Sequence, residues 1–285
     1  MFLIMKSHKN KTHACLTLIR LIGAATAFIL LFGCKPANKD AFQDSLLQKP
    51  AFRIHLISRD ISNWLGALSY QEELERHESE KKLDTEEQTL DRGRAIAARL
   101  IEQAIVLYPF SKSWEWELHV LESDDFNANC RAGGKIIVNS TVLDEDLLDD
   151  DQVAIVIGHE IAHALLEHSR ASYGRLAVAV GGGFVMSQSF KMGQVRWDTV
   201  ANGIQTLSLP VDREAEREAD LLGLALMTKA GFDPVQGARI WQTFSDGPAG
   251  SKISSRLELY ESNHPTSKER LELLTKAAAK FEKLK

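Results

Sequence analysis

The chain has 285 residues, of which 44% are hydrophobic and 26% charged, and its formal net charge is −5. This composition is that of an ordinary globular protein, which excludes a disordered chain, a collagen and a small disulfide-stapled domain. A mean hydropathy of −0.18 excludes a protein with many membrane spans. Because 34 basic residues stand against 39 acidic ones, no basic excess exists to follow a phosphate backbone, and we expect no nucleic-acid partner.

Residues 1–33 predict a secretion signal rather than part of the fold. Basic residues without any acid precede the uncharged run Leu21–Gly33. As a helix this run spans about 20 Å, which is too short for a bilayer core of about 30 Å. A basic start followed by a short apolar run is typical of a signal peptide.

The apolar run ends in Leu31-Phe32-Gly33-Cys34, which resembles a bacterial lipoprotein signal. The resemblance implies that Cys34 is lipidated and becomes the first mature residue, and Lys35 after it indicates the outer membrane. Phe32 departs from the pattern, because a small residue is usual there. Plain secretion and an uncleaved anchor therefore remain alternatives.

Beyond the signal, residues 34–48 are polar and predict a tether, and residues 49–285 predict a single domain. Apolar residues at helical spacing and strands of alternating pattern follow one another along this domain. In chain order the pattern predicts helices over 54–80 and 85–109, strands over 114–121 and 135–139, and helices over 147–170, 212–230, 234–244 and 266–283. Helices, a short sheet and further helices together predict an α+β, mostly helical fold.

The cysteines predict no internal disulfide in the mature domain. Of the three cysteines, Cys15 leaves with the signal and Cys34 would carry lipid, so only Cys130 remains. In an oxidising compartment a lone thiol is either buried or a liability.

The segment His159-Glu160-Ile161-Ala162-His163 is an HExxH motif in a stretch that is apolar on all sides. Buried charges without partners are costly, and a divalent cation supplies the compensation. His159 and His163 are four residues apart and share one helix face, a spacing that suits Zn²⁺. Glu160 lies one step round the helix and is the candidate general base. A core histidine pair hydrogen-bonded to the backbone is the alternative.

A third metal ligand must come from elsewhere in the chain. A histidine six residues after His163 would mark one class of site, but that position is Ser169. His168 is five residues on, and we expect it to point elsewhere with a structural role. The better candidate is Glu216.

Glu216 belongs to a stripe on the helix predicted over residues 212–230. Glu216, Asp220, Gly223 and Met227 follow 4-3-4 spacing, and the stripe continues into apolar residues, so it is expected to face inward. Asp220 can then accept a ring N–H from one ligand histidine and orient that ring. Glu218 falls off the stripe and is expected to be solvated. A charged amphipathic helix with no role in a site is the alternative.

These motifs together resemble the HtpX/Oma/BepA-type gluzincin zinc metallopeptidases over roughly residues 116–274. The similarity rests on HEIAH, on ExxAD at residues 216–220 and on Ala-Gly-Phe-Asp-Pro at residues 230–234. With a lipoprotein signal, the chain is most similar to the LoiP-like periplasmic lipoprotein members. The resemblance implies a zincin-like fold in which a short sheet packs on the HExxH helix. It implies one Zn²⁺ per chain on His159, His163 and Glu216, with Glu160 as catalytic base.

Residues 127–136 match the loop and edge strand that precede the metal helix in this family, although Ala132 stands where many members have proline. An exposed edge beside the metal would add an extended peptide by β-augmentation. Gly133, Gly134, Lys135 and Ile136 are therefore predicted to bind substrate. An ordinary strand is the alternative.

His264-Pro265 with Arg270 resembles the C-terminal element of the family, which approaches the active site. The resemblance makes His264 a candidate catalytic residue that stabilises the transition state, or a latch that occupies the metal. Arg270 would orient a carboxylate, such as one on the ligand helix. A capping loop before the last helix explains the same residues equally well.

The resulting prediction is a zinc-dependent endopeptidase of the bacterial cell envelope that hydrolyses misfolded or misassembled envelope proteins. The set of two histidines and a glutamate favours zinc over other divalent ions. The predicted location is the periplasm, with a lipid anchor in the outer membrane, and outer-membrane assembly machinery is a candidate partner. The alternative function is a non-catalytic or latent periplasmic chaperone or assembly factor for outer-membrane proteins.

Overall fold

A computed structural model describes residues 55–174, 197–240, 260, 264 and 268–283, with the backbone alone for 197–212 and 268. By its internal contacts the chain divides into two compact units, Met1–Asp44 and Ser45–Lys285, and every described residue belongs to the second. The predicted signal, the lipidation site Cys34 and the tether lie outside the described residues. Within the described part, no helix combines the length and the apolar character that a membrane span requires.

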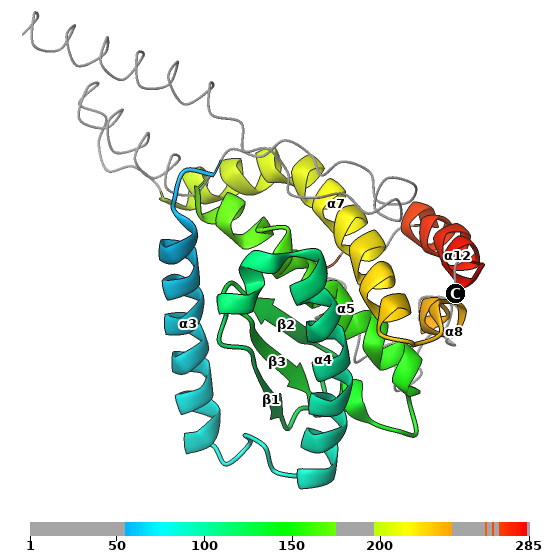
Figure 1. Ribbon diagram of the computed structural model, residues 1–285. Coiled ribbons are helices and arrows are strands. Elements are labelled where there is room, and N and C mark those ends of the chain that lie inside the picture. The colour runs from blue at the N-terminus through cyan, green and yellow to red at the C-terminus, as the bar shows by residue number, and fades with distance from the viewer. Residues whose placement is uncertain (1–54, 175–196, 241–259, 261–263, 265–267, 284–285) are drawn as a thin grey trace, which may run out of the picture. The chain divides into compact units, whose positions relative to one another are not determined.

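The described part is mostly helical with a small sheet, as the sequence predicted (Figure 1). The helices are α3 (Arg59–Ser79), α4 (Glu87–Leu107), α5 (Asp150–Leu165), α7 (Trp197–Lys229), α8 (Pro234–Ala238) and α12 (Lys268–Glu282). The strands are β1 (Glu117–Leu121), β2 (Ala128–Arg131) and β3 (Lys135–Asn139), and short 3-10 turns lie at Pro109–Ser113 and Ser140–Leu143. Helix α7 begins well before the predicted residue 212.

Strand β3 is the central strand of the sheet, whose order is β1-β3-β2. It pairs in parallel with β1 and antiparallel with β2, so both of its backbone edges are already hydrogen-bonded. Gly133 and Gly134, at φ 90° and 83°, form the turn between β2 and β3. The prediction that Gly133, Gly134, Lys135 and Ile136 form an exposed substrate-binding edge is therefore wrong. The consecutive apolar residues of β3 belong to a strand that is buried on both faces.

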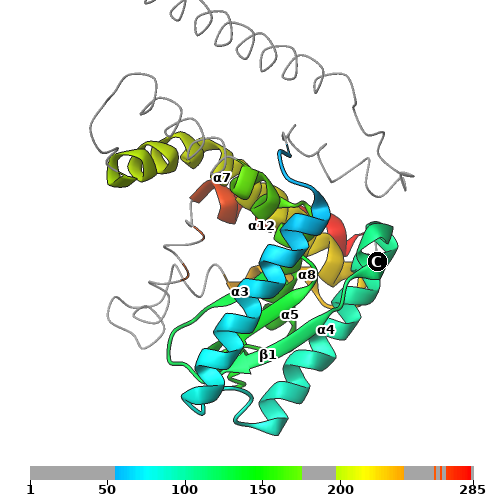
Figure 2. The same cartoon turned by 90° about the vertical axis from the view of Figure 1, so that its left-hand side faces the viewer.

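The sheet is covered on both faces, by α3 on one side and by α4 and α5 on the other (Figures 1 and 2). Tyr70 and Leu74 of α3 pack with Leu121 and Ile137. Opposite to them, Leu118 of β1 meets α4, and α5 contacts β2. The two edge strands are β1 and β2: the outer side of β1 meets Leu83 and Asp84, whereas β2 has no strand partner on its outer side among the described residues.

Helix α3 forms where predicted, but its most apolar stripe is not its buried face. Ile61, Trp64 and Leu68 are 49%, 62% and 54% exposed. The inward face instead carries small or polar residues together with Tyr70 and Leu74. Helical spacing located the helix, whereas the tertiary contacts decided which of its faces is buried.

Helix α5 begins with a capping box and ends sooner than predicted. The Asp149 carboxylate accepts a hydrogen bond from the Gln152 amide, and the Gln152 side chain accepts one from the Asp149 amide. After Leu165 the chain turns at Glu167, whose φ of 57° is uncommon for a residue other than glycine. Ion pairs from Arg59 and Arg170 to Glu167 stabilise this turn. Residues 168–174 are helical again in a new direction.

Helices α5 and α7 approach most closely where two glycines face each other. A Cβ added to Gly223 would lie 2.8 Å from the amide nitrogen of His159 and 3.0 Å from the carbonyl carbon of Gly158. A Cβ on Gly158 would lie 3.0 Å from the carbonyl oxygen of Gly223. Because the atoms met are backbone atoms, they cannot rotate away. This contact sets the distance between the HExxH helix and the helix that carries Glu216.

Replacing Gly223 by alanine is expected to push α7 away from α5. Gly223→Ala should destabilise the fold by about 1–3 kcal/mol through overpacking, which outweighs the gain of up to about 1 kcal/mol in helix propensity. The urea midpoint of unfolding measures this effect.

Gly93→Ala on α4 is the matched control, because the atoms nearest to its Cβ would be side-chain atoms of Leu143 and Leu118, at 3.0 and 3.3 Å. We expect its stability to stay within about 1 kcal/mol of wild type. Equal midpoints for the two variants would show that the glycine contact does not constrain the helices.

Candidate metal centre

The structure brings together the three side chains predicted to ligate a metal. The Nε2 atoms of His159 and His163 lie 3.0 Å apart. Glu216 faces both rings, with Oε2 3.3 Å from Nε2 of His159 and Oε1 3.2 Å from Nε2 of His163. Both histidines come from α5, where four-residue spacing places them on one face, and Glu216 comes from α7.

His264 joins this group from the C-terminal part of the chain. Its Nδ1 lies 3.1 Å from Oε2 of Glu216 and 3.3 Å from Nε2 of His159. The four side chains each offer one donor atom, and these atoms lie within 4.8 Å of one another. The ring of Tyr260 stacks on that of His264, with ring centroids 4.7 Å apart.

This donor set fits a zinc ion. Tetrahedral ligands at about 2.0–2.1 Å from Zn²⁺ lie about 3.3 Å from one another. The observed separations among His159, His163 and Glu216 run from 3.0 to 3.3 Å. Two imidazoles and a carboxylate are the ligand chemistry of a catalytic zinc site. Such polar atoms, pointed at one another in a buried place, gain from a cation at their centre.

Asp220 and Arg270 lie immediately behind the donors. Oδ1 of Asp220 is 3.0 Å from Nδ1 of His159, on the side of the ring away from Glu216. Arg270 donates to Asp220 through Nε and Nη2, both at 2.8 Å, and its Nη1 lies 3.1 Å from Glu216. All these side chains are buried, so the guanidinium compensates two carboxylates that water does not reach.

The surroundings shift the pKa values of the three donor side chains in different directions. Burial lowers the pKa of His159, but the carboxylates of Asp220 and Glu216 raise this pKa by more, to about 10. Burial lowers the pKa of His163 to about 3, so that ring is neutral. Burial raises the pKa of Glu216, but His159, His163 and His264 lower it much further, and the carboxylate stays ionised.

Glu160 lies beside the donor cluster and outside it. Its side chain is buried, and Oε1 lies 3.4 Å from Nε2 of His264. Burial raises the pKa of the Glu160 carboxyl. Cys130 on β2 is close enough for Glu160 to raise the pKa of its thiol, after the larger effect of burial. Glu160 thus lies near both His264 of the donor cluster and strand β2.

Similarity to known proteins shows the family to which this chain belongs. The sequence model of Peptidase family M48 matches residues 92–278, which span the sheet, α5, α7 and most of α12. The chain belongs to peptidase family M48.

Several M48 relatives are peptidases by name. The chain is 31% identical over 179 residues to mitochondrial metalloendopeptidase OMA1 of Schizosaccharomyces pombe, covering 61% of this chain and 50% of that protein. It is 32% identical over 163 residues to OMA1 of Arabidopsis thaliana, covering 57% and 31%. It is 24% identical over 193 residues to metalloprotease YcaL of Escherichia coli (strain K12), covering 66% and 72%. The match therefore spans half or less of the length of these OMA1 proteins.

Three residues of this M48 site were missed by the sequence analysis. His168, expected to point elsewhere, lies 2.9 Å from His163, Nδ1 to Nδ1. Glu218, expected to be solvated, is 8% exposed and accepts a hydrogen bond from His168. Tyr260 was not singled out at all. In a continuous helix a spacing of five residues does not place two side chains on the same face, so the sequence does not pair His163 with His168. The helix break at Glu167 changes the direction of His168.

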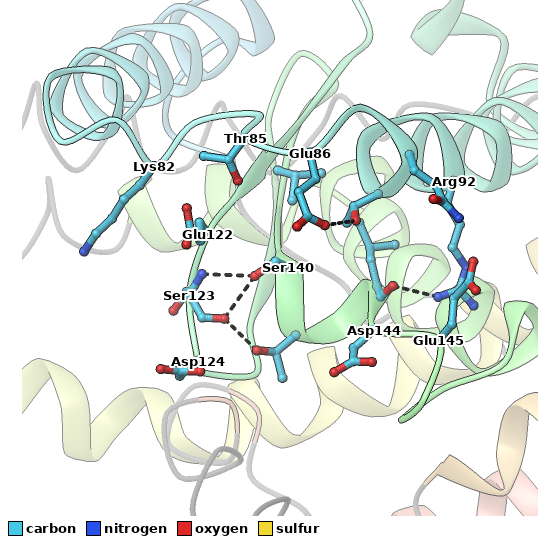
Figure 3. A pocket seen from close by; sticks show the side chains of 15 residues that line it. Lys82, Thr85, Glu86, Arg92, Glu122, Ser123, Asp124, Ser140, Asp144 and Glu145 are labelled. Atoms are coloured by element: carbon cyan, nitrogen blue, oxygen red, sulfur yellow. Dashed lines mark hydrogen bonds between the residues drawn. The ribbon is translucent and has the colours of Figure 1, made fainter.

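A separate cavity of about 700 Å³ is lined by none of the four donor residues of the M48 site (Figure 3). Its lining is rich in carboxylates, from Glu86, Glu122, Asp124, Asp144 and Glu145. Hydrogen bonds between Ser123, Ser140 and Thr141 brace one wall. The cavity holds no arrangement of histidine ligands.

Proposed function

We propose that this M48 protein is a zinc-dependent endopeptidase. The observation that carries the proposal is the meeting of His159, His163 and Glu216 at 3.0–3.3 Å with Glu160 buried beside them. The name of the OMA1 relatives, metalloendopeptidase, supports internal peptide bonds as the substrate class. A protein that only binds unfolded chains has no need of a buried carboxylate at Glu160.

In the proposed mechanism His159, His163 and Glu216 hold one ion per chain. When bound, Zn²⁺ lowers the pKa of a water molecule and polarises the scissile carbonyl. Glu160 takes the proton from the attacking water and then delivers it to the leaving amine. The raised pKa of Glu160 brings this carboxyl nearer to the pH at which it must both accept and donate. Asp220 orients the His159 ring, and Arg270 orients Asp220 and Glu216.

In the proposed zincin-like fold, we infer that the substrate lies along the sheet beside α5. The outer side of β2 is unpaired among the described residues, and α5 contacts this strand. An extended peptide added to β2 by main-chain hydrogen bonds would lie close to Glu160 of α5. This assigns substrate binding to β2 rather than to the turn and central strand at residues 133–136.

The position of His264 supports a latent form of the enzyme. Its Nδ1 is among the four donor atoms that converge, so the ring occupies the side on which water and substrate would approach. Stacking on Tyr260 stabilises this placement. We propose that His264 acts as a latch that must withdraw before the site can turn over.

The proposed location is the periplasm, in a LoiP-like lipoprotein anchored to the outer membrane through Cys34. This rests on the basic start, the short apolar run and the Leu-Phe-Gly-Cys sequence that ends it. The proposed substrates are misfolded or misassembled envelope proteins, and the outer-membrane assembly machinery is the proposed partner. A similarity to YcaL of E. coli is compatible with a bacterial setting.

Glu160→Gln tests the proposed reaction. The variant should keep the fold and one zinc per chain, because Glu160 is not among the donors, while casein cleavage falls by at least about 10²-fold, within the range for a positioned base. Cleavage and metal content by atomic absorption are measured on the same sample. Glu216→Ala is the complement, and it should lose zinc as well as activity.

Full cleavage by Glu160→Gln would contradict the assignment of the base, and unchanged zinc in Glu216→Ala would contradict the ligand. Chelator treatment of the wild type separates an enzyme from a chaperone. Cleavage that survives removal of the metal, or metal-loaded protein that binds casein without cutting it, would contradict the proposed function.

His264→Ala distinguishes a latch from a catalytic group, because the two roles give opposite signs. Loss of a latch should raise the rate of casein cleavage about tenfold, equivalent to removing about 1.4 kcal/mol of competing interaction. Loss of a group that stabilises the transition state should lower it by about 10²–10³-fold. Zinc content, expected to remain one per chain, is the control.

Cys34→Ser tests the proposed anchor. In a bacterial host fed radiolabelled palmitate, the wild type should take up label and fractionate with outer membranes. The Cys34→Ser variant should take up none and should appear in the soluble periplasmic fraction. Cys130→Ser, which changes a buried cysteine of the folded domain, is the control and should label as the wild type does. Label in Cys34→Ser would disprove the lipidation site.

A further inference from the structure

We propose that His168 and Glu218 are positioning residues that hold the ring of His163 with its Nε2 toward the metal. The inference rests on the proposed function, because it concerns how that zinc site is built. It starts from a chain of three buried or half-buried side chains. Nδ1 of His168 lies 2.9 Å from Nδ1 of His163, and Nε2 of His168 lies 3.2 Å from Oε2 of Glu218.

The hydrogen bonds along this chain have one consistent direction. A ring that binds a metal through Nε2 must keep its proton on Nδ1. His163 therefore donates from Nδ1, and Nδ1 of His168 accepts. A neutral His168 then carries its own proton on Nε2 and donates it to Glu218, whose carboxylate can only accept. Every ring nitrogen in the chain is thus matched to a role that suits ligation by Nε2 of His163.

The two proposed ligand histidines are therefore oriented by the same helix in two different ways. Asp220 of α7 contacts Nδ1 of His159 directly, at 3.0 Å. Glu218, two residues earlier on α7, reaches His163 through His168. His168 and Glu218 are 7% and 8% exposed, so water does not compete with this contact.

The backbone at the end of α5 is shaped for this contact. In a continuous helix His168 would lie on a different side of α5 from His163, because five residues rotate the direction by about 140°. The left-handed Glu167 interrupts the helix and brings the His168 ring back to His163. Glu167 is stabilised in that conformation by Arg59 at 2.7 Å and Arg170 at 3.0 Å. An uncommon conformation is thus stabilised at the residue that directs His168.

The test uses the full chain, loaded with zinc, and compares His168→Leu with His168→Asn. Leucine removes the acceptor, whereas the amide oxygen of asparagine can lie near the place of Nδ1. We expect His168→Leu to weaken the apparent zinc Kd by about 10- to 100-fold, the range for partners that orient ligand histidines. His168→Asn should recover most of that loss. Competition with a chromophoric chelator measures Kd without any substrate.

Glu218→Leu should weaken zinc binding in the same direction, and Glu214→Leu is its matched control on α7. Glu214 is half-buried and pairs with Arg217 rather than with a histidine, so zinc Kd should not change in that variant. In Co²⁺-substituted protein the visible absorption band should change in His168→Leu and Glu218→Leu and stay as in wild type in Glu214→Leu.

Wild-type zinc Kd and an unchanged cobalt spectrum in His168→Leu would overturn the inference while leaving the zinc site intact. If the leucine variants do not fold, ¹⁵N–¹H correlation of histidine rings in the zinc-loaded wild type decides. We expect a proton on Nδ1 of His163 and on Nε2 of His168, and the opposite tautomer on either ring would overturn the inference. A wild type that binds no zinc would overturn this inference and the proposed function together.

Discussion

The close approach of α5 and α7 is the constraint on which the centre depends. Gly158 and Gly223 face each other where no side chain fits, immediately before His159 and one turn after Asp220. At a wider separation a glutamate on α7 would not reach two imidazoles on α5. Since Glu216 and Asp220 precede Gly223 by whole turns, the same contact brings both carboxylates to the same histidines.

This proximity concentrates ionisable groups in an apolar interior, and the structure balances them group by group. Glu216 faces the imidazoles, Asp220 lies between His159 and Arg270, and Glu218 accepts from His168. Removing one member of a buried ionic set leaves its partner uncompensated, which costs several kcal/mol. Binding of a divalent ion and folding are therefore expected to be coupled in this protein.

The sequence predicted the parts of the centre that repeat at helical spacing. HExxH placed two imidazoles on one face, and the stripe from Glu216 through Gly223 marked the inward face of α7. What it could not predict depends on departures from regular structure. The direction of His168 follows from a left-handed residue at Glu167, which no local pattern announces. The burial of Glu218 goes with its contact to the redirected ring of His168.

The sheet shows a different limit of prediction from sequence, which concerns strand pairing. A run of apolar residues located β3, but the same run fits an edge strand and a central one until its partners are known. Those partners, β1 and β2, come from before it in the chain and pair on opposite sides. The exposed stripe of α3 has the same cause, since spacing alone does not say which face meets the sheet.

The position of Arg270 in the chain bears on the order in which the parts of the centre are synthesised and folded. Arg270 lies on α12, which follows every other described helix in the chain, yet its guanidinium serves Asp220 and Glu216, more than 40 residues earlier. Until α12 docks on α7, those carboxylates have no guanidinium beside them. Because synthesis proceeds from the N-terminus, a chain made only as far as α7 carries its HExxH helix and both carboxylates without the guanidinium that compensates them.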